Sequence, residues 1–387
     1  MNKTLSAYAH TRAEIDLDAL AFNLRQVRNL VGKEKKVLAV VKANAYGHGA
    51  LGIARELETL GVDFLGVAFL EEGIHLRECG IQQPMLILGG IFPFHIEDVV
   101  RFNLTPVIYD IQLASLLDAE GKRQSKKIPV HVKIDTGMNR IGVPSEEAEV
   151  FFTRLRDFEH LEIEGVLSHF SSAHVRDKAS RSFTDVQIER FKNILKRMHA
   201  SNIRPPLLHM ANSSAIMEGI MPELTMVRAG LMLYGAYPSR DLQSTIALTP
   251  VMTLKTRVIQ IKSLPVYSPI SYGRTFHTQR KSRIAILAIG YGDGYHYRLS
   301  NKGKVLIRGR EAPIVGAVCM DLAMIDTTDI PEAQVGDEAV LFGCQGEANI
   351  SVEDVAALAD TISYEILCGI SSRVPRLYKK QGECIET

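Results

Sequence analysis

The stretch that most constrains the fold of this chain is the apolar run Val37-Leu38-Ala39-Val40-Val41, followed at once by Lys42 and a glycine-punctuated turn. An uninterrupted, valine-rich run of this length is typical of a strand buried on both faces of a parallel sheet. Lys42 would then stand at the carboxyl end of the strand, where β/α barrels and open α/β sheets carry their chemistry. A lysine in partly apolar surroundings loses its proton more easily and can form a Schiff base with a carbonyl group. The alternative at this point is a lysine that only extends from the strand end to water.

Short apolar runs recur along the first 240 residues, with helix-length segments between them. The runs lie at residues 37–41, 64–68, 85–88, 105–109, 130–134, 163–167, 207–209 and 227–234. Amphipathic segments at 145–158 and 183–200 are predicted helices, the first opened by Ser145 as its N-terminal signal. In front of the first run we expect a strand at residues 13–16 and a helix capped by Asp18. The alternation predicts an α/β protein that begins with a (β/α)8 barrel over residues 13–240.

The pattern changes near Asp241. From Leu248 onward the apolar segments alternate with polar residues, glycine and proline punctuate them, and long helical intervals are missing. This predicts a mainly β C-terminal domain over residues 241–387, on which residues 1–12 are expected to pack. Ser351 is expected to open a short helix within it.

Composition excludes several classes of protein. Lysine and arginine number 45 against 44 acidic residues, a net charge of +1, so no nucleic-acid partner is expected. The five cysteines have no regular spacing, which argues against a metal site or a disulfide framework. The absence of an apolar run of about 18 residues, and of a signal-type block near the N-terminus, predicts a cytoplasmic protein with no membrane partner.

Polar side chains follow several of the predicted barrel strands at the same end. They are Lys42 after the first run; Lys133, Asp135 and Arg140 around the fifth; His169 after the sixth; His209, Asn212, Ser213 and Ser214 after the seventh; and Arg228 on the eighth. Barrel interiors do contain isolated polar residues. Functional groups at one end of so many strands favour an active site there.

Nine segments in a fixed order resemble the pyridoxal phosphate-dependent alanine racemases between Ala13 and Tyr378. They are AVVKANAYGHG (39–49), KIDTGMNRIG (133–142), SHF (168–170), MANSSA (210–215), VRAGLMLYG (227–235), SYGRT (271–275), IGYGDGY (289–295), VCMD (318–321) and SYEILCGISSRVPR (363–376). The resemblance implies an isomerase that interconverts L- and D-alanine through an external aldimine of pyridoxal 5'-phosphate and supplies D-alanine for peptidoglycan. It also implies a homodimer in which each active site borrows residues from the partner subunit.

The resemblance assigns catalytic roles to four residues. Lys42 matches the lysine that holds the cofactor and acts as the base on the D-enantiomer, and Tyr272 of the other subunit matches the base on the L-enantiomer. Racemisation requires a proton to leave one face of the α-carbon and another to arrive on the opposite face, which two positioned bases accomplish. His169 and Arg228 match the network behind the tyrosine, which would favour its phenolate.

The resemblance also assigns the cofactor contacts. Arg228 matches the arginine that faces the pyridine nitrogen; because a guanidinium has only donors, the ring nitrogen should stay unprotonated, which disfavours transamination. The phosphate would be held by neutral donors. The implied cofactor-binding set is Lys42, Tyr46, Arg140, His169, Asn212, Ser213, Arg228, Gly230, Leu231 and Tyr364.

For the substrate, Arg140 and the backbone N–H of the partner's Met320 match the carboxylate site, since a guanidinium gives a carboxylate an oriented contact. Tyr291 and Tyr364 match the inner gate of the access channel. Lys133 matches a lysine that is often carbamylated in the family and then orients Arg140.

Three positions depart from the family pattern. Ala317 stands where arginine is usual and Leu322 where glutamine is usual, both beside the carboxylate site, and Ala229 stands where proline is common. We expect the last to be a packing change.

Three alternative functions remain open. A barrel-type amino-acid decarboxylase would place a carboxylate at the ring nitrogen, against which Arg228 argues. A non-enzymatic pyridoxal phosphate carrier would lack the C-terminal β domain. A racemase of serine, lysine or several amino acids differs only at a few channel residues, so the sequence separates it least.

Overall fold

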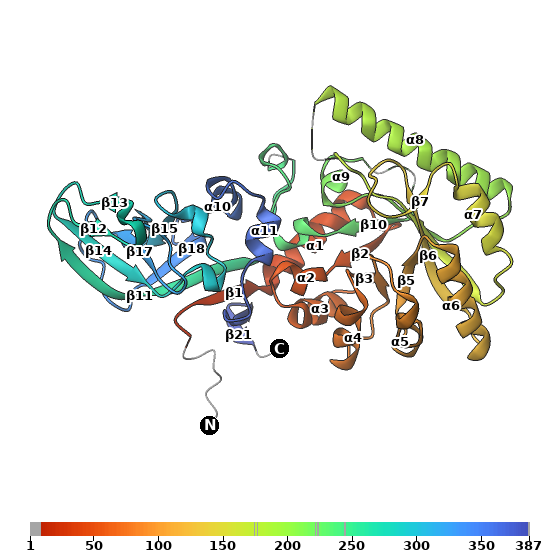
Figure 1. The fold of residues 1–387 in the computed structure, drawn as a ribbon, viewed down its shortest axis with the longest axis horizontal. Coiled ribbons are helices and arrows are strands. Elements are labelled where there is room, and N and C mark those ends of the chain that lie inside the picture. Colours follow the sequence, from red (N-terminus) through yellow and green to blue (C-terminus); the bar gives the residue numbers. More distant parts are fainter. Residues whose placement is uncertain are drawn as a thin grey trace.

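The computed structural model describes residues 9–385, except positions 174, 176, 221, 223 and 244. In these residues the first part of the chain forms a barrel and the second a largely β domain, and Figure 1 shows the two side by side along the long axis of the molecule. No helix in the described ranges is long and apolar enough to cross a membrane.

The barrel consists of parallel strands that close on themselves through a pairing of β5 with β6. Its strands are β2 (Lys36–Val40), β3 (Phe64–Val67), β4 (Met85–Ile87), β5 (Thr105–Ile108), β6 (Ile128–Asp135), β8 (Leu161–Leu167), β9 (Leu207–His209) and β10 (Met226–Ala229), with the short β7 (Val143–Pro144) beside β6. Every predicted barrel strand forms, but the last, expected over residues 227–234, ends at Ala229, and Leu231–Tyr234 form a 3-10 helix. Strands such as β3, β5 and β10 are buried along their whole length because helices cover the outside and side chains fill the inside.

Helices surround the barrel between the strands. They are α1 (Leu17–Val31), α3 (Ala50–Thr59), α4 (Leu70–Glu78), α5 (Ile96–Arg101), α6 (Ile111–Arg123), α7 (Ala148–Leu155), α8 (Lys178–Ala200) and α9 (Ser213–Met217). The predicted cap Asp18 is wrong by two residues: Asp16 is the N-cap of α1, and its carboxylate accepts the Ala19 N–H at 2.9 Å. The helix expected from Ser145 begins at Ala148, because residues 145–147 form a turn after the short strand β7.

The C-terminal domain is built on the long strand β11 (Met252–Leu264), which pairs antiparallel with three strands. The other strands are β1 (Arg12–Asp16), β12 (Pro269–Ile270), β13 (Phe276–His277), β14 (Ser282–Leu287), β15 (Lys304–Ile307), β16 (Arg310–Pro313), β17 (Ala323–Asp326), β18 (Glu338–Gln345), β19 (Ala348–Ile350), β20 (Arg376–Lys380) and β21 (Glu383–Ile385). The strand expected at residues 13–16 forms as β1, but it lies in this sheet, between β11 and β20, and not in the barrel.

We expected residues 1–12 to pack on this domain. Residues 1–8 lie outside the described part of the chain, and Arg12 pairs with Lys255 of β11. The division of the chain at residues 240 and 241 stays a prediction.

Two short helices, α10 (Val352–Leu358) and α11 (Ser363–Cys368), join the β domain to the barrel. Ser351 caps α10, as predicted. A Cβ on Gly47 would lie 2.0 Å from the Leu367 carbonyl oxygen, so α11 rests directly on the loop after β2. Arg376 donates to the Gly47 carbonyl at 2.9 Å. The C-terminal segment therefore braces the loop that follows Lys42.

Candidate active site

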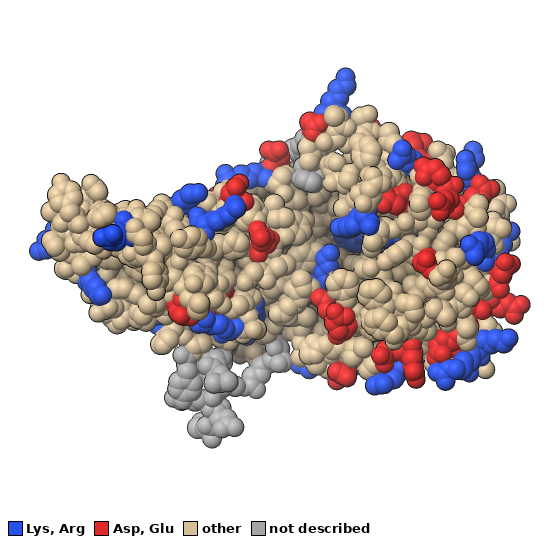
Figure 2. All heavy atoms as spheres, viewed as in Figure 1, with Lys and Arg blue, Asp and Glu red and all other residues tan. Residues whose placement is uncertain are grey.

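A pocket of about 590 Å³ opens at the carboxyl ends of the barrel strands. It brings together Lys42 and every other residue that the sequence assigned to the cofactor, and also Lys133: Lys42, Tyr46, Lys133, Arg140, His169, Asn212, Ser213, Arg228, Gly230, Leu231 and Tyr364. On the face seen in Figure 2, Lys and Arg atoms lie in a hollow near the junction of the two halves. The pocket is thus electropositive and built from both domains.

The backbone turns left-handed immediately after Lys42. Ala43, Asn44, Ala45 and Tyr46 have φ values of 52°, 54°, 53° and 52°. A left-handed conformation costs an L-residue about 1–2 kcal/mol, and consecutive residues rarely adopt it. Strain of this kind persists only where surrounding contacts over-determine it, and it gathers at functional sites.

Glu72, in the first turn of α4, supplies one such contact. One carboxylate oxygen accepts the Ala43 N–H at 2.7 Å and the other accepts the Ala68 N–H at 2.6 Å. The carboxylate therefore ties the residue after Lys42 to the end of β3. Sequence reasoning missed Glu72; its signal was a carboxylate in the first helical turn after a predicted strand end.

The amine of Lys42 is held in surroundings that favour its neutral form. Burial lowers the pKa of Lys42, the positive charges of Arg140 and Arg228 lower it further, and Glu72 opposes the shift. A lysine whose pKa is lowered by burial and neighbouring cations can act as a nucleophile or base.

Arg228 lines the pocket and is 4% exposed. Its Nη2 donates to the carbonyls of Ser168 and Met210 at 2.8 and 3.0 Å and lies 2.9 Å from Nδ1 of His169. Its Nη1 lies 3.0 Å from Nδ1 of His209. Burial and the charge of Arg140 lower the pKa of Arg228 to about 9, which leaves the guanidinium charged at neutral pH.

Lys133 lies beside Arg228 and Arg140 and is 6% exposed. Burial, followed by the charges of Arg228, Arg140 and Lys42, lowers the pKa of Lys133 to about 7. A substantial neutral fraction near pH 7 is what reaction of an amine with carbon dioxide requires. Arg140 is exposed at the rim, and its backbone N–H donates to Asp135 at 3.1 Å.

The pocket also offers neutral donors. The Ser213 hydroxyl accepts the Gly230 N–H at 2.9 Å, and a Cβ on Gly230 would lie 2.8 Å from the Tyr46 hydroxyl. Burial raises the pKa of Tyr46, and it raises that of Tyr364 to about 12, so both phenols stay protonated. Hydroxyl and backbone N–H groups that converge around a glycine suit a phosphate.

The remaining predicted site residues lie outside this pocket. Tyr272 stands between β12 and β13, which Figure 1 shows at the end of the β domain away from the barrel. Its side chain is 76% exposed, at an open hollow of about 650 Å³ that Leu322 also lines. Met320, 54% exposed, and Tyr291, also exposed, lie on the β domain. Within one chain, these residues do not reach the barrel pocket.

The turn that carries Tyr272 contacts Ala317, the position where the family usually has arginine. The Ser271 hydroxyl donates to the Ala317 carbonyl at 2.6 Å, so the backbone, not the replaced side chain, makes this contact. The Gly292 N–H donates to the Met320 carbonyl at 2.9 Å and fixes Met320 beside Tyr291.

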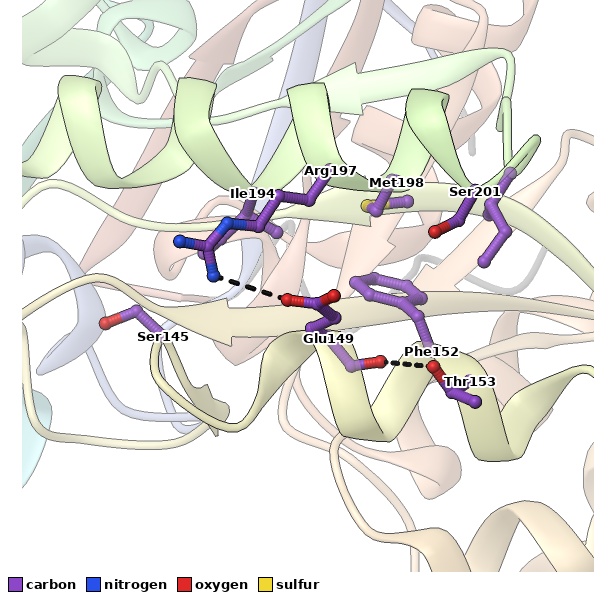
Figure 3. Close-up of a pocket in the computed structure, with 9 residues that line it drawn as sticks. Ser145, Glu149, Phe152, Thr153, Ile194, Arg197, Met198 and Ser201 are labelled. Carbon is purple, nitrogen blue, oxygen red and sulfur yellow. Dashed lines mark hydrogen bonds and ion pairs between the residues drawn. The ribbon is translucent and has the colours of Figure 1, made fainter.

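A second cavity, between α7 and α8, carries no comparable chemistry. It measures about 20 Å³, room for about one water molecule, and the Glu149–Arg197 ion pair, 3.4 Å long, lies across it (Figure 3). No group of three or more His, Cys, Asp or Glu side chains in the described part of the chain is arranged to hold a metal ion.

Two family models together match most of the chain. The family model described as "Alanine racemase, N-terminal domain" matches residues 15–238, and that described as "Alanine racemase, C-terminal domain" matches residues 251–378.

Individual relatives match along nearly the whole chain. An alanine racemase of Halothermothrix orenii is 47% identical over 98% of this chain and 99% of its own length. An alanine racemase of Geobacter sulfurreducens is 46% identical over 95% of this chain and 97% of its own length. Among solved structures, alanine racemase of Clostridium difficile 630 superposes with a TM-score of 0.91 at 38% identity, covering 98% of both chains. That of Bacillus anthracis with bound L-Ala-P gives 0.89 at 34% identity, covering 98% and 97%.

Proposed function

Because the chain belongs to the alanine racemase family, we propose that it interconverts L- and D-alanine with pyridoxal phosphate bound in the barrel pocket. The observation that carries the proposal is the convergence in that pocket of an amine of lowered pKa, a buried donor-only guanidinium and a cradle of neutral donors.

The residues present fit the cofactor. Lys42 offers the amine for its aldehyde, Arg228 a donor for its ring nitrogen, and Tyr46, Ser213 and the backbone of Gly230 the donors for its phosphate. Asn212, Leu231 and Tyr364 line the same pocket. When bound, pyridoxal phosphate supplies a carbonyl that takes up the substrate's amino group and a ring that withdraws electrons from its α-carbon.

Lys42 has two roles in this account. Its amine would hold the cofactor, and when free it would remove or return the α-proton on one face of the substrate. Its lowered pKa suits the second role, because a general base works best when its pKa lies near the working pH. Arg228 keeps its own protons, so it would offer the ring nitrogen a hydrogen bond and no proton.

The second base comes from a second copy of the chain. Tyr272 cannot act on the pocket of its own chain, yet it stands exposed at a hollow that the exposed Leu322 also lines. We infer a homodimer in which Tyr272 of one protomer serves the opposite face of the α-carbon in its partner's pocket, with His169 and Arg228 behind it. Apolar groups exposed next to a polar catalytic group are the expected surface of such an interface.

The substrate's carboxylate would be held by Arg140 and by the backbone N–H of Met320 from the second protomer. Carbamylation of Lys133 would turn a neighbouring cation into an anion that orients Arg140. Tyr364, with Tyr291 of the second protomer, would gate access to the pocket. The D-alanine formed would serve peptidoglycan synthesis in the cytoplasm.

The test is a racemisation assay of the purified chain on the enantiomers of alanine, serine and lysine, with and without added pyridoxal phosphate. We expect cofactor-dependent interconversion of both alanine enantiomers, fastest among the panel. Faster turnover of serine or lysine would reassign the substrate, and release of carbon dioxide without inversion would indicate a decarboxylase.

A further inference from the structure

A line of hydrogen bonds leads from Arg228 away from the pocket and through the barrel interior. Nη1 of Arg228 lies 3.0 Å from Nδ1 of His209, Nε2 of His209 lies 2.9 Å from Nδ1 of His131, and Nε2 of His131 lies 3.1 Å from Oε2 of Glu164. We call these four residues the histidine chain. Both imidazoles are fully buried, whereas the Glu164 side chain is 26% exposed.

The barrel leaves room for the histidine chain at Gly165. A Cβ on Gly165, the neighbour of Glu164 on β8, would lie 2.5 Å from the His131 ring. Glycine at this position therefore lets the imidazole pack closely against β8 beside Glu164.

The donor capacity of each group fixes the direction of every bond in the histidine chain. A guanidinium only donates, so Nδ1 of His209 must accept and its proton must lie on Nε2. That Nε2–H donates to Nδ1 of His131, whose proton must then also lie on Nε2, from where it donates to Glu164. The reverse direction would point an imidazole N–H at the guanidinium. Two neutral imidazoles thus connect a buried cation to a carboxylate.

Arg228 has no direct counter-charge among the described residues. Its described partners are carbonyls and imidazoles, and no described carboxylate is within ion-pair distance of it. Burying a cation without a compensating anion is costly, and a hydrogen-bonded network in the low-dielectric interior transmits polarisation between its ends.

We propose that Glu164 is a positioning residue for Arg228: through His131 and His209 it supplies the remote counter-charge that holds the guanidinium charged and oriented toward the pocket. The structural part of this inference stands on the hydrogen bonds alone. Its consequence for turnover rests on the proposed function.

The structural part is tested by nitrogen-15 NMR of the histidine-labelled full chain without cofactor, with resonances assigned from His131→Gln and His209→Gln variants. We expect both imidazoles to be neutral with the proton on Nε2. A proton on Nδ1 of either ring, or a charged ring at neutral pH, would overturn the histidine chain whether or not the protein is a racemase. In Glu164→Ala the fixed tautomer of His131 should be lost.

The functional part is tested by kinetics of Glu164→Gln, which keeps the shape and an acceptor oxygen but removes the charge. We expect kcat for alanine to fall about tenfold, the effect of a hydrogen bond to a charged group, with KM unchanged because Glu164 does not touch the substrate. Glu162→Gln, an exposed glutamate on the same strand, is the matched control and should match the wild type.

A wild-type kcat in Glu164→Gln would refute the positioning role, and so would a rise in KM alone. Equal losses in the Glu162 control would assign the effect to the surface charge of β8 instead. If the wild-type chain fails to racemise alanine at all, the proposed function falls, while the tautomer measurement still decides the histidine chain.

Discussion

Nη2 of Arg228 lies 2.9 Å from Nδ1 of His169. Because a guanidinium cannot accept, the Nδ1 of His169 that faces it carries no proton, and the two Nη2 hydrogens are shared between this nitrogen and the Ser168 and Met210 carbonyls. Burial and the surrounding charges of Arg228, Arg140 and Lys133 hold the pKa of His169 well below its usual range, so the ring stays neutral. One arginine thereby sets the tautomer of histidines on both of its sides, His169 at the pocket and His209 in the barrel interior.

Replacing Arg228 with lysine should disrupt this arrangement. A single ammonium group cannot reach the acceptors on both sides of the guanidinium, where Nη1 faces His209 and Nη2 faces His169 and two carbonyls. Each buried acceptor left unpaired costs about 1–3 kcal/mol. We expect the free energy of unfolding to fall by at least this amount, measured by urea titration, and kcat to fall with it. Arg181→Lys, at an exposed position on α8, is the control. Equal stability of the two variants would contradict the account.

The two hydrogen bonds by which Glu72 ties Ala43 to Ala68, here called the Glu72 clamp, are tested by Glu72→Gln. The amide keeps one acceptor oxygen but turns an NH2 group toward the Ala43 or Ala68 N–H, so one of the two bonds is lost. We expect a loss of about 1–3 kcal/mol in the free energy of unfolding and a lower kcat, because the left-handed turn after Lys42 loses a constraint. Glu71→Gln, exposed on the same turn, should leave both quantities unchanged. A Glu72→Gln variant as active and stable as this control would argue against the clamp.

Lys133 gives stability a pH dependence of known sign. Its pKa is about 7 in the folded chain and near the ordinary lysine value of 10.5 in the unfolded one. Between these values the unfolded chain binds the extra proton, so the folded state gains stability as pH rises, by at most about 1.4 kcal/mol per pH unit. Lys133→Met should lack this contribution. Urea unfolding at pH 7, 8 and 9 in carbonate-free buffer should give a shallower slope for the variant; equal slopes would contradict the lowered pKa.

Much of the barrel could be predicted because its strands are buried on both faces and read as uninterrupted apolar runs. The run before Lys42 and the other predicted barrel runs all form strands. The residue that begins a helix was harder to predict where two possible N-cap residues lie close together. Asp16 and Asp18 are both possible caps, and only the course of the chain out of β1 selects Asp16. The partners of β1 could not be predicted, because its pairing with β20 joins segments at opposite ends of the sequence.

The residues of the candidate site also divide into those that the sequence could predict and those that it could not. Lys42, His169 and Arg228 follow or lie on predicted strands, so their convergence in one pocket follows from barrel geometry. Glu164 lies on a predicted strand and Glu72 in the first helical turn after one, but neither position indicates the hydrogen bonds on which the role of each depends. The separation of Tyr272 from the pocket also depends on three-dimensional domain placement, which no local pattern encodes.

Sharing of active sites between protomers can be tested by mixing two inactive variants. Lys42→Ala and Tyr272→Phe subunits should each lack activity alone. In a mixed dimer with Tyr272 acting across the interface, one pocket carries both substitutions and the other carries neither, so activity should partly return. Subunit exchange would be verified by native mass spectrometry. Exchange without recovered activity would refute the shared site.

The most direct test of the account is deuterium exchange at the α-carbon in the Tyr272→Phe variant. If Lys42 and Tyr272 serve opposite faces, the variant should still exchange the α-proton of D-alanine with deuterated water through Lys42. Exchange from L-alanine should fall by about 10²–10⁴-fold, the contribution of a positioned general base. The measurement follows deuterium incorporation into each enantiomer before inversion, with the wild-type chain as reference. Slow exchange from L-alanine with retained exchange from D-alanine is the predicted result; equal exchange from both would show that one base serves both faces and would contradict the two-base site.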